Sequence, residues 1–389
     1  MLFIQFHCYN FKMNKYTVPV NEPCLWGKEK KYLLKCLNDG IISSSGPFVR
    51  EFEKKFAKRV NRKFAISVSN GTAALQLAYE SLNIKKKEEV ILPSFTIISC
   101  ILPIIRSGAI PILIDSDQVT WNMDVNKIEK KITSQTRAII APHIYGLPID
   151  MEPLLKIAKK YKLKVIEDAA EVLGLKYKNK ECGSFGDVSI FSFYANKHIT
   201  TGEGGMIVTN NKQIAEKCKS LRNICFNEER RFLHYDLGWN YRFTNLQSAI
   251  GLAQLEKLNH FIIKKRKIGK IYNKELSKIK IFNTPLDAKK YAKNIYWVYG
   301  IVLKKNSPIS LNTLMKKLKL YGIETRNFFW PLHQQPILKK MGFFKNTKLP
   351  VAEYLSRNGL YLPTGLSITY LQQQFVIDKI KKIVSKLNN

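Results

Sequence analysis

Short apolar runs alternate with amphipathic stretches between residues 64 and 209, and this alternation narrows the possible folds more than any other feature. Continuous apolar runs are typical of strands that are buried on both faces. Strands that alternate with helices predict an α/β fold with a mostly parallel sheet. Ligands bind such sheets at the carboxyl ends of the strands, so functional residues are expected in the loops that follow. The seven expected strands are Phe64–Val68, Val90–Leu92, Ile110–Ile114, Ala138–Ala141, Lys164–Glu167, Val188–Phe193 and Gly205–Thr209.

The pattern changes after residue 210, where long Lys-rich helical stretches appear, one of them running roughly from Thr244 to Lys278. We expect a large domain over residues 16–260 and a smaller C-terminal α+β domain over residues 261–389. Residues 1–15 are expected to be a disordered extension. The later elements expected from the pattern are a strand at Tyr296–Leu303, a helix at Leu311–Tyr321, a short strand or turn at Tyr361–Pro363 and a closing helix through Val376, Ile380 and Ile383.

The chain is strongly basic, with 64 Lys and Arg against 30 Asp and Glu among 389 residues, a net charge of +34. Such a charge attracts polyanions, but the lysines are spread along the whole sequence and form no Arg-rich block or nucleic-acid-binding motif. We therefore expect a solvated surface and no specific nucleic-acid partner. No apolar run reaches the ~18 residues of a membrane span, and the first residues lack signal-peptide features, so the prediction is a cytoplasmic protein without a membrane partner.

Seven cysteines at irregular spacings form no CxxC pair, and no HExxH motif occurs, so reduced thiols and no metal site are expected. There is also no P-loop and no GxGxxG fingerprint. Residues 69–72, Ser-Asn-Gly-Thr, do lead from an expected strand into a helix. Backbone N–H groups at such a turn can cradle a phosphate, although an ordinary helix start capped by Ser or Thr explains the same residues.

Two ionisable residues follow expected strands. Asp168 comes directly after the strand expected at Lys164–Glu167. A carboxylate there, in a crevice partly shielded from water, needs a cationic partner, or else it caps a helix. Lys197 lies between two buried strands, an unusual place for a solvated lysine. Partly buried lysines have a lowered pKa and form Schiff bases with carbonyl compounds. His198 is expected to make local hydrogen bonds and to ligate no metal.

Six motifs then occur in order and together resemble the DegT/DnrJ/EryC1/StrS family of sugar aminotransferases over residues 16 to the C-terminus. The motifs are NGTAAL at Asn70–Leu75, LPSFT at Leu92–Thr96, HIYGLPIDM at His143–Met151, IEDAAEVLG at Ile166–Gly174, GSFGDVSIFSFYANKHITTGEGGM at Gly183–Met206 and GWNYRFTNLQSAIGLAQL at Gly238–Leu255. The resemblance implies the fold-type I architecture of pyridoxal 5′-phosphate (PLP) enzymes, with a seven-stranded, mostly parallel sheet in the large domain. It also implies PLP as cofactor and a homodimer whose active sites lie at the subunit interface.

The same resemblance implies roles for residues near the cofactor ring. Lys197 matches the family lysine that bonds to PLP and shuttles the proton. Asp168 matches the carboxylate that keeps the pyridine nitrogen protonated, so that the ring can act as an electron sink. Glu171 occupies the position beside the ring hydroxyl, and Phe95 matches the aromatic residue that stacks on the ring.

The phosphate of the cofactor has its own matching residues. Gly71, Thr72 and Ser192 match the family's phosphate cradle, and Asn240 matches an asparagine that reaches the phosphate bound by the other subunit. Further along the chain, Arg326 and the segment around His333 resemble the part of these enzymes near the sugar nucleotide. His333 is equally well explained as an exposed structural histidine.

One branch of the family has His in place of the lysine and performs dehydration, so Lys197 favours transamination. The segments 143–151 and 196–206 are most similar to enzymes that transfer an amino group from L-glutamate to C4 of a nucleotide-linked 4-keto-6-deoxy sugar. The expected substrate is GDP-4-keto-6-deoxymannose, and the expected product is GDP-perosamine, for O-antigen or another surface polysaccharide.

Two alternatives remain open at this point. Nothing in the sequence identifies the base, so a UDP- or dTDP-linked 4-keto-6-deoxy sugar is an alternative substrate. A basic nucleic-acid-binding or regulatory protein that kept the fold without catalysis is the second alternative. The combination of Lys197, Asp168 and Ser192 argues against it, because a binding protein has no need of a Schiff-base lysine.

Overall fold

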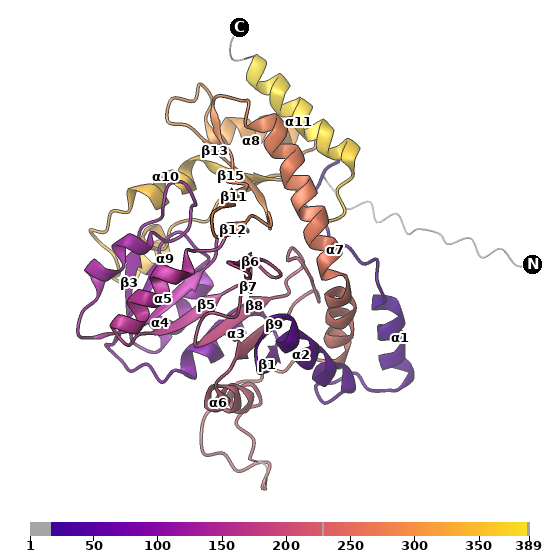
Figure 1. Ribbon diagram of the computed structural model, residues 1–389, viewed down its shortest axis with the longest axis vertical. Coiled ribbons are helices and arrows are strands. Elements are labelled where there is room, and N and C mark those ends of the chain that lie inside the picture. Colours follow the sequence, from indigo (N-terminus) through magenta and orange to yellow (C-terminus); the bar gives the residue numbers. More distant parts are fainter. Residues whose placement is uncertain (1–16, 228, 387–389) are drawn as a thin grey trace, which may run out of the picture.

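The computed structural model describes residues 17–227 and 229–386, and the extension expected at residues 1–15 lies outside the described part. A seven-stranded sheet forms the centre of the molecule, in the order β1-β9-β8-β5-β4-β2-β3 (Figure 1). Only β9 runs against its neighbours, so the sheet is mostly parallel, and each expected run of the region becomes a strand. The strands are β1 (Phe64–Val68), β2 (Glu89–Pro93), β3 (Ile110–Ile114), β4 (Thr136–Pro142), β5 (Lys164–Asp168), β8 (Val188–Ser192) and β9 (Gly205–Thr209).

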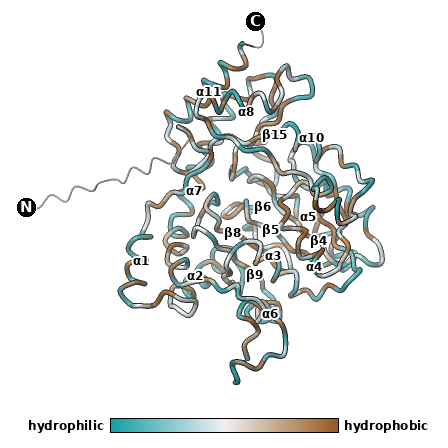
Figure 2. Tube along the Cα trace, turned by 180° about the vertical axis from the view of Figure 1, so that it is seen from behind, coloured by the Kyte–Doolittle hydropathy of each residue, from teal (hydrophilic) through white to brown (hydrophobic). Residues whose placement is uncertain are grey.

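Helices cover both faces of this sheet because successive strand residues point to opposite sides. In β2, Ile91 packs into one core, whereas Val90 and Leu92 pack into the other. Figure 2 shows hydrophobic segments gathered around β4 and β5, between the helical layers. The helices of the two layers are α1 (Glu29–Asn38), α2 (Pro47–Arg59), α5 (Met151–Lys160) and α7 (Asn245–Leu276) on one side, and α3 (Gly71–Glu80), α4 (Leu102–Arg106) and α6 (Lys212–Arg222) on the other.

A second, antiparallel sheet follows in the order β10-β13-β15-β14. Its apolar face packs against α8, α11 and the last turns of α7 around a core that includes Tyr272 and Tyr299. The strands are β10 (Phe282–Asn283), β13 (Tyr299–Leu303), β14 (Arg326–Asn327) and β15 (Gly359–Leu362). The helices are α8 (Leu311–Leu320), α9 (Pro336–Lys340), α10 (Pro350–Asn358) and α11 (Tyr370–Ser385).

Helix α7 joins the two parts of the molecule (Figure 1). Thr244 caps its first turn in a capping box with Gln247, which explains why the helix begins there. Phe261 packs in the core of the large sheet, whereas Ile268 packs in the core of the second sheet. The domain boundary expected at residue 260 therefore falls within one continuous helix, and the division into 16–260 and 261–389 stays a prediction.

Two small hairpins, β6 (Lys176–Tyr177) with β7 (Lys180–Glu181) and β11 (Ala288–Lys289) with β12 (Ala292–Lys293), complete the described strands. Six cysteines lie in the described part of the chain, all of them buried and free; Cys8 lies outside it. No helix among the described residues is long and apolar enough to cross a membrane.

Candidate active site

A cavity of about 750 Å³ opens where the parallel strands of the large sheet end. The loops after β1, β2, β4, β5 and β8 form its floor, as expected for a parallel sheet. Residues from the far end of the chain, among them Trp297, Phe329 and Tyr361, add a wall. Of the residues expected to be functional, the cavity brings together Gly71, Thr72, Asp168, Glu171, Ser192 and Lys197.

Lys197 lies in the loop between β8 and β9, and only 12% of its side chain is exposed. Its Nζ is 3.8 Å from Oε1 of Glu171 and 3.7 Å from the ring centroid of Trp297. Burial lowers the pKa of Lys197, although the charges of Glu171 and Asp168 oppose this effect. A larger share of the amine is therefore neutral than in an exposed lysine, and a neutral amine can attack a carbonyl or accept a proton.

Asp168 is the last residue of β5 and is buried. Its Oδ1 accepts a hydrogen bond from the backbone N–H of Ala170 at 3.1 Å, and its Oδ2 accepts one from the Cys100 thiol at 3.5 Å. Burial raises the pKa of Asp168, and no ion pair within the described residues involves it. A buried carboxylate without a cation fits a ligand that brings a protonated nitrogen.

Glu171 is the second carboxylate near the lysine. Its Oε2 accepts a hydrogen bond from the backbone N–H of Tyr145 at 2.7 Å. Burial raises the pKa of Glu171, and the charge of Lys197 opposes this shift. Burial thus moves both partners of the pair toward their neutral forms, so a proton can pass between the site and a ligand at little cost.

Helix α3 supplies the positive end of the cavity. Its N-cap is Asn70, whose Oδ1 accepts a hydrogen bond from the N–H of Ala73 at 2.8 Å, so the expectation of a Ser or Thr cap is wrong. A Cβ at Gly71 would lie only 2.9 Å from the Cβ of Ser192, so only glycine fits at this close approach. The hydroxyl of Thr72 is 2.9 Å from that of Ser99. Free N–H groups and hydroxyls at a helix N-terminus suit a phosphate group.

The structure adds residues that the sequence did not reveal. Arg106, at the end of α4, lines the same cavity as Gly71 and Thr72 and contributes a second cation besides Lys197. Glu203 and Tyr241 also line it. No motif marks Arg106, because it reaches the cavity only through the packing of α4 beside α3.

Four of the candidate residues do not line this cavity: Phe95, His333, Arg326 and Asn240. Phe95 is fully buried and packs edge-on against Tyr145, with ring centroids 5.9 Å apart, so the expected stacking position is not where the structure places it. The next residues, Thr96 and Ile97, line the cavity instead. The strand end that carries the LPSFT motif was correctly located, but sequence alone could not say which of its side chains turns inward.

His333 is a structural residue, so its assignment as a sugar contact is wrong. Its Nδ1 is 2.7 Å from the hydroxyl of Ser94, and its Nε2 is 3.1 Å from Oε1 of Glu353. The ring is 2% exposed, so the alternative of an exposed histidine is wrong as well. These contacts tie the segment after β14 to the end of β2.

Arg326 and Asn240 are exposed and lie outside the lining of this cavity. Arg326 donates a hydrogen bond to Glu324 at 2.6 Å. Tyr361, which pairs with Arg326 from the adjacent strand β15, does line the cavity. Asn240 accepts a hydrogen bond from Nε of Arg242 at 3.0 Å. Their expected contacts with the substrate and with a partner's phosphate stay predictions.

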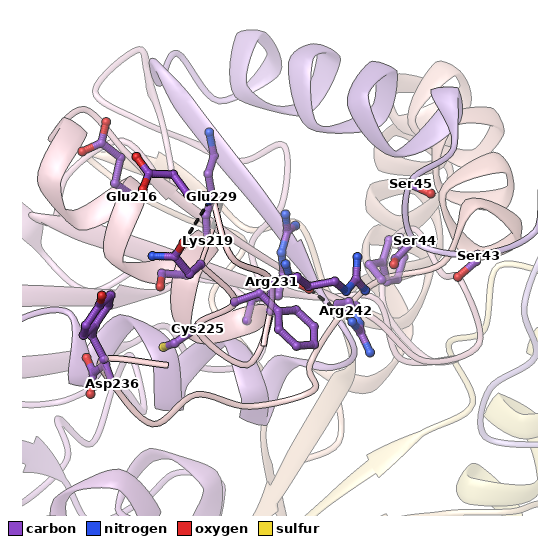
Figure 3. Close-up of a pocket in the computed structure, with 17 residues that line it drawn as sticks. Ser43, Ser44, Ser45, Glu216, Lys219, Cys225, Glu229, Arg231, Asp236 and Arg242 are labelled. Carbon is purple, nitrogen blue, oxygen red and sulfur yellow. Dashed lines mark hydrogen bonds between the residues drawn. The ribbon is translucent and has the colours of Figure 1, made fainter. Parts of the chain in front are cut away.

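A larger hollow of about 1100 Å³ lies beside α6 (Figure 3). Ser43, Arg231, Asp236 and Arg242 are among the residues that line it. It is not at the carboxyl ends of the strands, and none of the expected cofactor-binding residues lines it. The chemistry of the smaller cavity, with its lysine, carboxylates and helix N-terminus, therefore identifies that cavity as the candidate active site.

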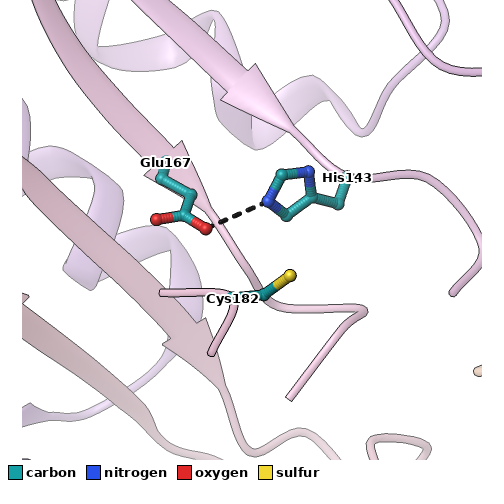
Figure 4. A group of neighbouring side chains, drawn as sticks. All are labelled: His143, Glu167 and Cys182. Carbon is teal, nitrogen blue, oxygen red and sulfur yellow. Dashed lines mark hydrogen bonds and ion pairs between the residues drawn. The ribbon is translucent and has the colours of Figure 1, made fainter. Parts of the chain in front are cut away.

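A buried group of His143, Glu167 and Cys182 has the spacing of a metal site (Figure 4). Glu167 nevertheless accepts hydrogen bonds from the N–H of Gly183, the hydroxyl of Ser189 and other donors. The Nδ1 of His143 accepts from a backbone N–H, so its Nε2 carries the proton that faces Glu167 at 3.1 Å. The protein itself satisfies this group, which holds the loop after β7 against β5.

His198 is fully buried beside Lys197, and burial keeps the pKa of its ring well below the usual value. Neither ring nitrogen reaches a partner in hydrogen-bonding geometry among the described residues, although the backbone of Ile295 lies nearby. The expectation of local hydrogen bonds stays a prediction, and the neutral ring packs beside the lysine.

Comparison with known proteins agrees with this geometry. The model of the DegT/DnrJ/EryC1/StrS aminotransferase family matches residues 23–381. The GDP-perosamine synthase of Escherichia coli O157:H7 is 42% identical, over 95% of this chain and 99% of that protein. The GDP-perosamine synthase of Caulobacter vibrioides is 38% identical, over 94% of this chain and 98% of that protein. The structure of the Helicobacter pylori aminotransferase PseC, involved in pseudaminic acid biosynthesis, superimposes with a TM-score of 0.90 at 26% identity. The match covers 95% of this chain and 99% of that one. This chain belongs to the DegT/DnrJ/EryC1/StrS aminotransferase family.

Proposed function

We propose that this protein transfers the amino group of L-glutamate to C4 of GDP-4-keto-6-deoxymannose and so makes GDP-perosamine for a surface polysaccharide. The observation that carries the proposal is the buried Lys197 between Glu171 and Trp297, in the same cavity as Asp168 and the N-terminus of α3. Three relatives at 38–42% identity are named GDP-perosamine synthase, which supports this sugar over a UDP- or dTDP-linked one.

The cofactor is PLP, and the cavity offers a fitting group at each end. Lys197 would hold its carbonyl carbon, Asp168 its ring nitrogen and Glu171 the region of its ring hydroxyl. Gly71 and Ser192 close the space at the start of α3, where a side chain on the glycine would collide, and this cradle fits the phosphate. When bound, PLP supplies an electron sink for the carbanion that forms at the carbon bearing the amino group.

The protein's own residues move the protons. The neutral Nζ of Lys197 takes the proton from Cα of glutamate and later delivers one to C4 of the sugar. The carboxylate of Asp168 holds a positive charge in place, and its burial makes that interaction stronger than it would be in water. Over both half-reactions, glutamate and the keto sugar become 2-oxoglutarate and the amino sugar.

The outer part of the cavity suits the sugar nucleotide. Phe329, Tyr361 and Trp297 form an aromatic wall, and a 6-deoxy sugar presents an apolar methyl group to such a surface. Arg326 is exposed beside Tyr361 and is proposed to contact the negatively charged diphosphate. Arg106 is proposed to add positive charge at the phosphate end of the cofactor.

We further propose that the active form is a homodimer with shared sites. The loop after α6 projects from the molecule (Figure 1) and exposes Phe232, Tyr235 and Leu237, each at 79% or more. Apolar residues grouped in this way are typical of a protein interface. Asn240 follows directly and would then reach the phosphate in the partner's cavity. The nucleotide-linked substrate and the free, buried cysteines favour a cytoplasmic location.

The test is to incubate the purified protein with PLP, L-glutamate and separate GDP-, UDP- and dTDP-linked 4-keto-6-deoxy sugars. Mass spectrometry identifies the aminated product, and Lys197→Ala serves as the control for uncatalysed amination. Amination of the GDP sugar at the highest kcat/KM supports the proposal. Preference for a UDP or dTDP sugar would overturn the choice of nucleotide, and absence of amination from all three would overturn the function.

A further inference from the structure

We propose that Trp297 is a positioning residue that holds Nζ of Lys197 against its indole face and away from Asp168. The inference rests on the proposed function, in which Lys197 is the reactive amine. No part of the resemblance or of the sequence pattern assigns a role to Trp297.

The contact itself is close. Nζ of Lys197 lies 3.7 Å from the centroid of the indole ring, and Trp297 is only 4% exposed. The face of an indole carries negative charge density and attracts a cation, most strongly where water is excluded. The ring therefore stabilises the ammonium form of the lysine at this position in the cavity.

Hydrogen bonds hold both the side chain and the backbone of Trp297. Its Nε1–H donates a hydrogen bond to the carbonyl of Asn196 at 2.9 Å, the residue directly before Lys197. Nζ of the buried Lys265 donates to the backbone carbonyl of Trp297 at 2.9 Å and to that of Thr364 at 2.6 Å. The ring is thus tied to the lysine's own loop, and the backbone of Trp297 is tied to α7. A side chain held in this way can fix the position of the lysine Nζ.

The consequence concerns Asp168. Nζ of Lys197 forms an ion pair with Glu171 at 3.8 Å, whereas none of the ion pairs in the described chain joins it to Asp168. With the ammonium held at the indole, the buried carboxylate of Asp168 stays available for a cation from the cofactor.

The charged groups around the lysine determine how this is tested. Glu171, Asp168 and Cys100 favour the ammonium form of Lys197, whereas burial favours the neutral amine; the neighbouring His198 is neutral. The indole face of Trp297 also favours the ammonium, because it stabilises only the charged form of the Lys197 amine. Removing the ring therefore lowers the pH at which Lys197 loses its proton.

The experiment uses cofactor-free, full-length protein and no substrate. Trace acetic anhydride labels neutral amines over a range of pH, and mass spectrometry reads the Lys197 peptide. We expect the midpoint for Trp297→Leu to fall by about one pH unit, a tenfold change in the acid dissociation constant, and for Trp297→Phe by less. Trp121→Leu removes a buried indole from the same aromatic cluster without touching Lys197, and its midpoint should stay with the wild type.

Fluorinated tryptophan keeps the test decisive if Trp297→Leu does not fold or admits water. Incorporation of a fluorotryptophan withdraws charge from the ring face with almost no change in shape. Fluorination should lower the pH midpoint of Lys197 labelling in the wild-type protein. It should leave that midpoint unchanged in Trp297→Phe. An unchanged midpoint in fluorinated wild-type protein overturns the inference. Because the labelling needs neither cofactor nor sugar, this outcome is separate from a failure of the transamination assay.

Discussion

Replacing Asp168 by Asn is expected to separate catalysis from folding. The carboxylate is buried, accepts hydrogen bonds from Ala170 N–H and the Cys100 thiol, and forms no ion pair among the described residues. Asparagine has nearly the same shape, keeps an acceptor for Ala170 and lacks the charge. The change therefore removes the interaction with a protonated ring nitrogen while it leaves the surrounding packing intact.

The size of the effect follows from the burial of the site. Two unit charges 4 Å apart interact by about 4 kcal/mol at an effective dielectric constant of ~20. Removal of one such preorganised group commonly costs about 3 to 4 kcal/mol of barrier. The expected loss in kcat is therefore about 100- to 1,000-fold at saturating PLP and L-glutamate.

Stability of the cofactor-free protein is expected to change in the opposite direction. Burial raises the pKa of Asp168, so the folded state holds this proton to a higher pH than the unfolded state does. The charged carboxylate then lowers stability as the pH rises above its unfolded pKa of about 3.9. Asp168→Asn should melt at or above the wild-type temperature at pH 7, and the difference should shrink toward pH 3.

The assays are steady-state amination and thermal unfolding followed by circular dichroism. Asp39→Asn, which removes an exposed carboxylate paired with Lys35, is the matched control and should leave kcat unchanged. Turnover by Asp168→Asn within about fivefold of the wild type would refute the reasoning about the charge. A large drop in the melting temperature would show that the effect on activity came from misfolding.

Four further outcomes are expected. Borohydride reduction should fix PLP to the peptide containing Lys197, and Lys197→Ala should keep some cofactor through the phosphate cradle yet lose transamination; a label on another lysine would contradict the assignment. Asn240→Ala should weaken PLP retention more than folding, and a monomer by light scattering that still turned over would exclude the shared site. His333→Ala should cost about 1–3 kcal/mol of unfolding free energy, because it leaves buried partners unpaired, with little change in KM. Since the net charge is +34, kcat/KM for the nucleotide sugar should fall modestly with salt while kcat stays constant, and duplex DNA binding should be weak and steeply salt-dependent.

The strands of the large sheet could be predicted from the sequence because each is a continuous apolar run with a turn at its end. Asp168 and Lys197 could be located for the same reason, since they follow strands whose carboxyl ends meet in one cavity. The roles of Trp297 and Arg106 in the cavity could not be predicted from the sequence. Their places depend on the packing of the second sheet and of α4 against that cavity, and no local pattern encodes such packing.

Phe95 shows a limit of a different kind. The motif locates the end of the strand. It does not tell which of the successive side chains there faces the ligand and which faces the core. The structure turns Phe95 into a cluster with Tyr145 and Phe328 and leaves Thr96 and Ile97 on the wall. In an irregular loop the alternation of side chains is lost, so the direction of each one follows only from tertiary packing.

Buried polar residues of two kinds occur around the cavity, and their partners distinguish them. His333 has a partner at each ring nitrogen, and Lys265 donates to two backbone carbonyls, so each is a cross-link between segments. The Nζ of Lys197 makes no hydrogen bond within the described part of the chain, and the carboxylate of Asp168 accepts hydrogen bonds only from a backbone N–H and a thiol. Burying a charge without a full set of partners costs free energy, so such residues persist where a ligand completes the set. The number of hydrogen-bond partners, rather than burial, therefore separates the charged residues Lys197 and Asp168 from the cross-links His333 and Lys265.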